Sequence, residues 1–154
     1  MTDTRRPTPA NKAVSAQMSR MPRVATTPEL TIRRELYRRG LRFRVNYRQL
    51  PGRPDIAFTR ARIAVFVDGC FWHRCPEHGI LPRNNREWWR AKLERNVARD
   101  REKDDLLRKA GWVVVHLWEH EDPMLVSERI EQLWRSRRAK VPNHPAGENP
   151  RIEM

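Results

Sequence analysis

The sequence predicts an α/β domain in which helices cover a mixed sheet, and three observations lead to this prediction. A continuous apolar run at 63–67 is typical of a buried central strand. From Trp89 to Val97, apolar residues recur at every fourth position, as one face of a helix requires. Segments of the two kinds follow one another in the order α-β-β-β-α-β-α, which indicates two or three layers.

Each element has a local signal of its own. Thr27, Pro28 and Glu29 open the first helix with a capping residue and an early proline, and Gly40 ends it. A Pro-Gly-Arg-Pro turn at 51–54 separates two short strands. The other elements are predicted as strands at 43–45, 55–58, 63–67 and 112–118, a long helix from Asn85 to Ala110 and a last helix at 126–137.

The chain has 154 residues, which fits one domain with unstructured ends. The segment 1–25 is rich in proline, threonine and basic residues and is predicted to be a disordered basic arm. The domain itself is predicted at 26–138, and the proline-rich segment 139–154 is predicted to be a disordered tail. A core of this size often needs a staple such as a metal ion.

The charge balance indicates a polyanionic partner. Lysine and arginine number 32 against 19 acidic residues, which gives a formal net charge of +13. Nucleic acid is the expected partner, because each neutralised phosphate releases counterions. No apolar run has the length needed to cross a bilayer, and no signal-peptide core follows the N-terminus. We therefore expect a soluble cytoplasmic protein with no membrane partner.

Cys70, Cys75 and His78 lie close together with the spacing C-x4-C-x2-H. In a cytosolic protein this pattern indicates a zinc site more strongly than a disulfide. A closed tetrahedral site needs a fourth ligand. His120 and His116 are both candidates from the strand at 112–118, and the position of His120 beyond the strand end favours it.

Two carboxylates fall at strand ends. Asp55 begins the strand at 55–58 and Asp68 follows the strand at 63–67, so both are candidate ligands of a catalytic Mg²⁺ ion. Backbone carbonyls at this strand end would add further oxygen ligands. His73 lies in the same loop and is a candidate general base or acid, with a spare zinc ligand as the alternative.

Two aromatic pairs, Phe71-Trp72 and Trp88-Trp89, are candidates for wedging between DNA bases. In the second pair, helix spacing predicts one side chain toward the core and one outward. The helix that carries it is rich in arginine and is the expected phosphate-contacting element, although a solvated charged face is the alternative. The residues expected to contact the DNA backbone are Arg86, Arg90, Asn96 and Arg99.

These motifs resemble the very-short-patch mismatch-repair (Vsr) endonucleases, a family with a restriction-endonuclease-like fold. The string Asp-Gly-Cys-Phe-Trp-His at 68–73, at this distance from Gly-Arg-Pro-Asp at 52–55, is highly specific. The resemblance extends from about residue 27 to about residue 122. Its matching pieces are 27–29, 51–56, 64–73, Asn96, Arg99-Asp100 and 111–120.

The resemblance implies a role for each matching residue. Asp55 is similar to the family's Mg²⁺ ligand, His73 to its catalytic histidine and Glu29 to the acid that supports this histidine. The aromatic residues inserted beside the mismatch would be Phe71, Trp72 and Trp89. The structural zinc ligands would be Cys70, Cys75 and His120, with His78 completing the set by its composition.

The chain departs from the family pattern at one point. The family has Thr and then His where this chain has Val67 and Asp68. Val67 can still offer its backbone carbonyl to Mg²⁺, whereas an ionised Asp68 cannot donate a hydrogen bond near the scissile phosphate. Asp68 would instead serve as an added metal ligand, which leaves the number of Mg²⁺ ions open.

The resemblance implies a Mg²⁺-dependent endonuclease with a structural zinc ion. It would nick one strand of duplex DNA beside a T·G mismatch and so initiate repair of deaminated 5-methylcytosine. Mismatch-repair proteins and a repair polymerase are expected partners, and a monomer is expected. One alternative is a restriction or phage-defence nuclease that acts on matched DNA, and another is a non-catalytic zinc DNA-binding module.

Overall fold

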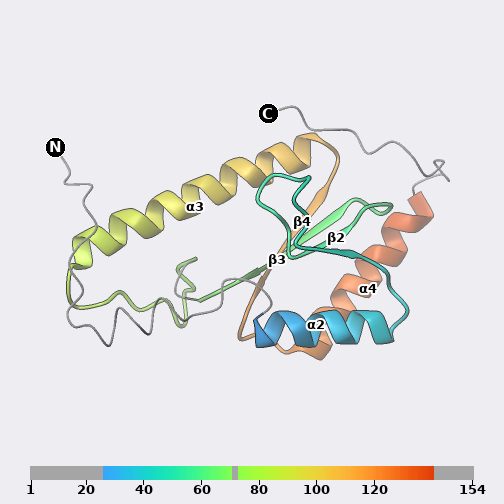
Figure 1. Cartoon of the computed structure of the whole chain (residues 1–154), viewed down its shortest axis with the longest axis horizontal. Coiled ribbons are helices and arrows are strands. Elements are labelled where there is room, and N and C mark those ends of the chain that lie inside the picture. Colours follow the sequence, from blue (N-terminus) through green and yellow to red (C-terminus); the bar gives the residue numbers. More distant parts are fainter. Residues whose placement is uncertain (1–25, 71–72, 141–154) are drawn as a thin grey trace.

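The computed structural model describes residues 26–70 and 73–140. A four-stranded mixed sheet lies between helices (Figure 1), which confirms the predicted α/β class and the predicted order of elements. The last helix extends to Lys140, two residues beyond the expected domain boundary at 138. The elements are α2 (Thr27–Arg38), β1 (Arg44–Val45), β2 (Ile56–Phe58), β3 (Ile63–Asp68), α3 (Arg86–Lys109), β4 (Val113–Trp118) and α4 (Pro123–Lys140).

The strands lie in the order β1-β2-β3-β4. The β1–β2 and β2–β3 pairs are antiparallel, whereas β3 and β4 are parallel, with α3 as the crossover between them. In the parallel pair, Ile63 is opposite Val113 and Asp68 is opposite Trp118. The loops that follow β3 and β4 therefore leave the sheet side by side.

Helices pack on both faces of the sheet because strand side chains alternate between the faces. On one face, Ile32 and Leu36 of α2 and Val126 and Ile130 of α4 join the inward side chains of β2 and β3 in the larger core. On the other face, Leu107 of α3 packs with Trp112 over the small residues Ala57 and Ala64. Each fully buried Leu, Ile or Val side chain contributes roughly 1.5–3 kcal/mol.

The start of α2 is fixed by a capping interaction. The Thr26 backbone N–H donates to the Glu29 carboxylate at 3.3 Å, and Pro28 lies in the first turn. Gly40 follows the helix at a φ of +86°, a conformation that costs glycine little. This local geometry places buried Glu29 close to the beginning of β2.

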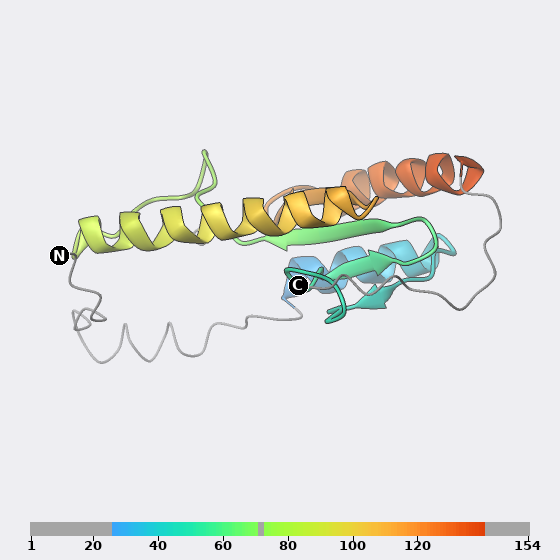
Figure 2. The same cartoon turned by 90° about the horizontal axis from the view of Figure 1, so that it is seen from above.

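Helix α3 is 24 residues long, and its C-terminal half packs on the sheet. Its N-terminal half runs past the end of the sheet, alongside the chain that precedes it (Figure 2). The exposed positions of this projecting half carry several basic residues, including Arg86, Arg90 and Arg95. In the part of the chain that the structure describes, none of the helices is long and apolar enough to cross a membrane.

Candidate active site and metal centre

The antiparallel pairing of β2 and β3 brings the start of one strand beside the end of the other. Asp55 precedes β2, and its Oδ2 atom accepts a hydrogen bond of 2.7 Å from the Val67 backbone N–H. Asp68 ends β3 directly after Val67. Residues more than ten positions apart in the sequence therefore share one end of the sheet.

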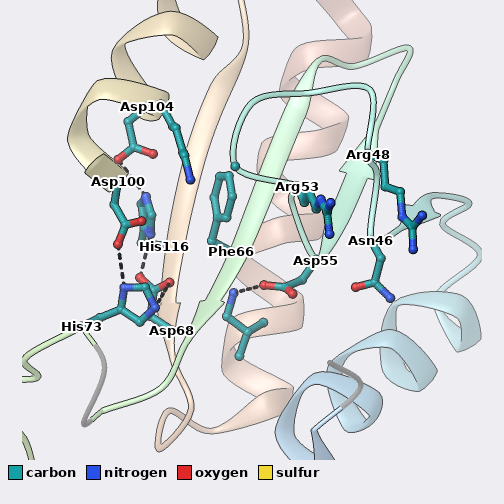
Figure 3. A pocket seen from close by; sticks show the side chains of 13 residues that line it. Asn46, Arg48, Arg53, Asp55, Phe66, Asp68, His73, Asp100, Asp104 and His116 are labelled. Carbon is teal, nitrogen blue, oxygen red and sulfur yellow. Dashed lines mark hydrogen bonds and ion pairs between the residues drawn. The ribbon is translucent and has the colours of Figure 1, made fainter. Parts of the chain in front are cut away.

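A pocket of about 390 Å³ opens at this end of the sheet (Figure 3). It contains Asp55, Asp68 and His73, three of the four residues predicted to be catalytic, whereas the fourth, Glu29, is not among the lining residues. Strands β3 and β4, helix α3 and the loop before β2 all contribute side chains. The lining residues are Asn46, Arg48, Gly52, Arg53, Asp55, Phe66, Val67, Asp68, His73, Asp100, Lys103, Asp104 and His116.

The Asp55 carboxyl is in an environment that favours a bound cation. Burial raises its pKa to about 6, against the opposing effect of the Val67 N–H, and the negative charges of Glu29 and Asp68 raise it further. A cation at this carboxylate would offset both the desolvation and the repulsion. Carboxylate and carbonyl oxygens are ligands that Mg²⁺ prefers, so Asp55 and the neighbouring carbonyl of Val67 fit this ion.

His73 is oriented by α3. Its Nδ1 atom lies 2.8 Å from Asp100 Oδ2, and a ring nitrogen bonded to a carboxylate must be the donor. The Nε2 atom then faces the pocket, 3.8 Å from Asp68 Oδ1. Burial lowers the pKa of His73, but the Asp100 hydrogen bond and the charge of Asp68 outweigh it, so the pKa is raised. His73 is therefore placed to exchange a proton at Nε2.

The carboxylate beside His73 is that of Asp100, where the resemblance implies Glu29. Glu29 accepts hydrogen bonds from the Thr26 N–H and from Arg33 Nη2. The same Arg33 atom also donates to the Asp55 backbone carbonyl at 3.4 Å. Glu29 is thus linked through Arg33 to Asp55, because the first turn of α2 lies on that side. His73 instead contacts α3 through Asp100. The pairing of Arg99 and Asp100 in the family pattern was the available signal for Asp100.

Asp68 belongs to a second hydrogen-bonded group. Its Oδ2 atom lies 2.7 Å from His116 Nδ1, and His116 Nε2 lies 2.8 Å from Asp104 Oδ2. Burial lowers the pKa of His116, but the two carboxylates outweigh it and raise the pKa to about 9. From the sequence, His116 was expected only as an alternative zinc ligand, and Asp104 was not expected at the site. No spacing rule links positions 68, 104 and 116.

The four residues of the expected zinc cluster lie together. The donor atoms of Cys70, Cys75, His78 and His120 are all within 4.8 Å of one another. The Cys70 Sγ atom is 3.2 Å from His120 Nδ1 and 4.0 Å from His78 Nδ1, and Cys75 Sγ is 3.8 Å from each. In a tetrahedral zinc site, sulfur and nitrogen ligands are about 3.6 Å apart. The fourth member is thus His120 and not His116.

The surroundings of this cluster also fit a structural metal ion. The loop is tight, because the Cys75 N–H donates to the Cys70 carbonyl and the Gly79 N–H to the Cys75 carbonyl, at 2.9 and 2.8 Å. Cys70 and Cys75 are buried free thiols, and burial beside Cys75 raises the pKa of Cys70 to about 11. A bound cation would stabilise the Cys70 thiolate, which burial disfavours.

The predicted DNA-contacting residues are spread along α3. Both Trp88 and Trp89 are half-buried and pack edge-to-face with ring centroids 5.0 Å apart, whereas one inward and one outward ring was expected. The Lys92 ammonium lies 4.9 Å from the centre of the Trp88 ring. Arg86 is exposed, Arg90 lies 3.7 Å from Glu87, and Arg99 donates to the Asn96 side chain. Phe71 and Trp72 lie outside the described residues.

Comparison with known proteins decides the family. Residues 8–77 match the family described as DNA mismatch endonuclease Vsr. The type II nicking enzyme V.NaeI of Lentzea aerocolonigenes is 44% identical over 121 residues, which cover 75% of this chain and 73% of that enzyme. The chain belongs to the Vsr family. The recognition from the 52–55 and 68–73 motifs is thereby confirmed.

Other Vsr relatives show the same relationship. The type II nicking enzyme V.NmeDIP of Neisseria meningitidis serogroup C is 36% identical over 117 residues, which cover 73% of this chain and 79% of the relative. The DNA mismatch endonuclease Vsr of Escherichia coli K12 is 42% identical over 83 residues, 52% of each chain. The protein is thus an endonuclease of the Vsr family, and DNA is the substrate class of that family.

Proposed function

We propose that this protein is a Mg²⁺-dependent endonuclease that nicks one strand of duplex DNA beside a T·G mismatch and so starts very-short-patch repair. One observation carries the proposal: Asp55 and His73 line the same pocket in a chain of the Vsr family. A hard-oxygen metal ligand and a histidine free at Nε2 are the two groups that phosphodiester hydrolysis needs.

In this mechanism Asp55 and the Val67 carbonyl would hold Mg²⁺, which supplies charge neutralisation for the scissile phosphodiester when bound. His73 accepts a proton at Nε2 from the attacking water. Asp100 holds the other ring nitrogen in its protonated form at 2.8 Å and stabilises the positive charge that develops on the ring. Glu29 keeps Arg33 against the backbone of Asp55 and thereby supports the ligand.

Basic residues at the rim would bind the substrate. Arg48, Arg53 and Lys103 line the pocket and are exposed, so they can contact phosphates on either side of the scissile bond. Further along the duplex, we assign backbone contacts to Arg86, Arg90, Asn96 and Arg99 on the projecting helix α3.

Recognition of the mismatch is assigned to aromatic residues. We propose that Phe71, Trp72 and Trp89 enter the base stack at the T·G step. Unstacking costs a few kcal/mol at a paired step and least where pairing is weak, so an inserted side chain selects the mismatch. Trp89 stands on the part of α3 that extends beyond the sheet (Figure 2), where a duplex can approach it.

A second candidate function has support from the relatives. V.NaeI, V.XorIIP of Xanthomonas oryzae and V.NmeDIP are named type II nicking enzymes, which favours nicking at a defined sequence. The same pocket would cleave the phosphodiester in either function. The two functions differ in whether a mismatch or a base sequence is recognised. Each group that the chemistry uses comes from one chain, so we propose that the protein acts as a monomer.

The test is a nicking assay with Mg²⁺ on end-labelled duplexes that carry T·G or matched C·G in varied flanking sequences. Asp55→Ala is the inactive control and Asp105→Ala, an exposed residue of α3, is the matched control. A single cut in the T-bearing strand, lost only in Asp55→Ala, supports the proposal. Equal cutting of matched duplex supports the second candidate. Binding without Mg²⁺-dependent cutting contradicts both and leaves a zinc DNA-binding module.

A further inference from the structure

The pocket holds more carboxylates than its proposed chemistry uses. Asp55 and Asp100 have roles as metal ligand and as partner of His73, but Asp68 and Asp104 also line it. Both of these side chains are only 11% exposed. Buried carboxylates in a site that must receive a phosphodiester raise its negative charge, so an arrangement that neutralises them has a direct consequence for substrate.

His116 lies between these two carboxylates. Its Nδ1 atom is 2.7 Å from Asp68 and its Nε2 atom is 2.8 Å from Asp104 (Figure 3). A ring nitrogen can bond to a carboxylate only by donating, and two donating nitrogens make an imidazolium. Between two ionised carboxylates, His116 is therefore expected to be a cation. Its ring also stacks on Phe66, with centroids 5.0 Å apart and planes 13° apart.

The arrangement leaves one oxygen of Asp68 for the reaction. Oδ2 is taken by His116, whereas Oδ1 lies 3.8 Å from His73 Nε2, too far for a direct hydrogen bond. Oδ1 thus points at the nitrogen that exchanges the proton. A carboxylate fixed in this way stabilises His73 when its ring becomes charged.

We propose that His116 is a positioning residue of this nuclease: clamped between Asp68 and Asp104, it turns Asp68 toward His73 and withdraws it from metal binding. Asp104 fixes the His116 ring, and His116 in turn fixes the Asp68 carboxylate. Asp68 Oδ1 then faces His73 Nε2. The inference deepens the proposed nuclease function and rests on it. It also implies that Asp55, and not Asp68, is the carboxylate ligand of Mg²⁺ at this strand end.

The neighbouring strand thus provides the imidazole that the family pattern places at position 68. In the parallel register, His116 of β4 is directly opposite Phe66 of β3, so its ring reaches the same pocket from the adjacent strand. A carboxylate at 68 and a histidine at 116 form one unit, and neither is expected to work without the other.

The first experiment measures Mg²⁺ binding by calorimetry, which does not depend on cutting. Asp55→Asn should lose Mg²⁺ binding, whereas Asp68→Asn should keep a dissociation constant within about twofold of the parent. A tenfold or larger weakening in Asp68→Asn would make Asp68 a metal ligand and overturn the proposal. Zinc content and melting temperature are followed in parallel to show that each variant is folded.

The second experiment measures kcat and KM on a duplex that the parent cuts. Asp68→Asn and His116→Gln should each lower kcat by about 10–100-fold with KM within about twofold. The double variant should be no slower than the slower single variant, because both changes break one unit. Multiplicative losses, or a fully active His116→Gln, would contradict the clamp. Partial recovery in His116→Arg, which keeps the positive charge, separates charge from mere packing.

The third measurement records the nitrogen chemical shifts of the histidine side chains at neutral pH. His116 should have both ring nitrogens protonated in the parent and lose this signature in Asp104→Asn. A neutral His116 in the parent contradicts the clamp even if nicking is normal. If no duplex is cut, the nuclease proposal fails, but the calorimetric and spectroscopic results still decide the clamp.

Discussion

Two clusters of polar side chains lie next to each other at one end of the sheet, and they differ in their donor atoms and in how closely those atoms approach one another. Cys70, Cys75, His78 and His120 place sulfur and nitrogen donors within 4.8 Å of one another. The neighbouring pocket of about 390 Å³ is instead lined by carboxylates, histidines and basic side chains. Donors that close on one another hold a structural ion, whereas an open site with oxygen donors leaves room for substrate.

The two clusters share the same strand ends. Asp68 ends β3 and Cys70 follows it, while His116 lies in β4 and His120 follows that strand. Parallel pairing of the strands brings each pair together, one in the pocket and one in the metal cluster. We therefore propose that a metal ion held by the Cys/His cluster would anchor the loop that carries His73. Because His73 lies between Cys70 and Cys75 in the sequence, its position depends on both.

The largest expected effect comes from opening the metal cluster. Cys75→Ala should lose zinc and melt more than about 10 °C below the parent, because structural zinc supplies about 10–16 kcal/mol in small zinc domains. Metal analysis and thermal melting by circular dichroism measure this. Asp55→Ala is the control and should retain zinc. Unchanged zinc content and melting in Cys75→Ala would refute the anchor role.

The second prediction tests the other side of the comparison. Asp55→Ala should reduce nicking by at least about 10³-fold, since the expected Mg²⁺ ligand is removed. Its melting temperature should stay equal or rise, because the change removes a carboxyl whose pKa burial raises to about 6. Single-turnover nicking and thermal melting give the two values. An active Asp55→Ala variant would remove Asp55 from the metal site.

The third prediction concerns the partner of His73. Asp100→Asn should lower kcat by about 10–100-fold, because the amide no longer holds the Nδ1–H form of the ring. KM for the duplex should change by less than about twofold. Asp105→Asn, a nearby exposed carboxylate paired with Arg108 at 3.6 Å, is the matched control and should behave as the parent.

The fourth prediction is a pH dependence with a defined sign. Burial lowers the pKa of His73, but the hydrogen bond to Asp100 and the charge of Asp68 raise it above 6.5 overall. His73 accepts a proton only when neutral, so nicking should increase as pH rises through this pKa and fall below it. In Asp100→Asn the midpoint of the kcat–pH profile should move to lower pH. An unchanged kcat–pH midpoint in Asp100→Asn would show that Asp100 does not raise the pKa of the group that titrates.

The smallest effect is expected far from both clusters. The Arg38 and Arg39 side chains hydrogen-bond to Glu35 and lower its pKa to about 2 from an ordinary value of 4.5. Because the folded pKa is the lower one, this stabilisation is present above about pH 4.5 and is lost as pH falls toward 2. Glu35→Gln should lower the melting temperature slightly at neutral pH and not near pH 2. Zinc content and nicking should remain at the parent level, and a loss of either would show that α2 supports the clusters more directly.

Much of the fold was predictable because its signals are local. The apolar run at 63–67 gave the central strand β3, and the fourfold repeat from Trp89 to Val97 gave α3. The C-x4-C-x2-H spacing alone was enough to predict that Cys70, Cys75 and His78 form a metal-binding cluster. The structure placed these residues as expected, since each signal depends on neighbours in the sequence.

The partners of the site were not predictable in the same way. Alternation could not choose between His116 and His120, because both positions are even, and only the place of His120 beyond the strand end favoured it. Asp104 carries no mark that separates it from Asp105 on a charged helix, and Asp100 is marked only by the Arg99-Asp100 piece of the family pattern. The choice follows from how α3 crosses the sheet, which depends on packing between Leu107 and Trp112 and not on the acidic residues themselves.

The sequence by itself therefore determined the element order, the Cys/His motif and the family, and it named Asp55 and His73, which the structure places in one pocket. The tertiary structure confirmed the favoured His120 beside the thiols, and it alone placed His116 between Asp68 and Asp104. The physical reason is the distance along the sequence over which each signal acts. Periodicity and spacing depend on neighbouring residues, whereas a contact between β3, α3 and β4 exists only after the parallel strand pair and its crossover helix have packed.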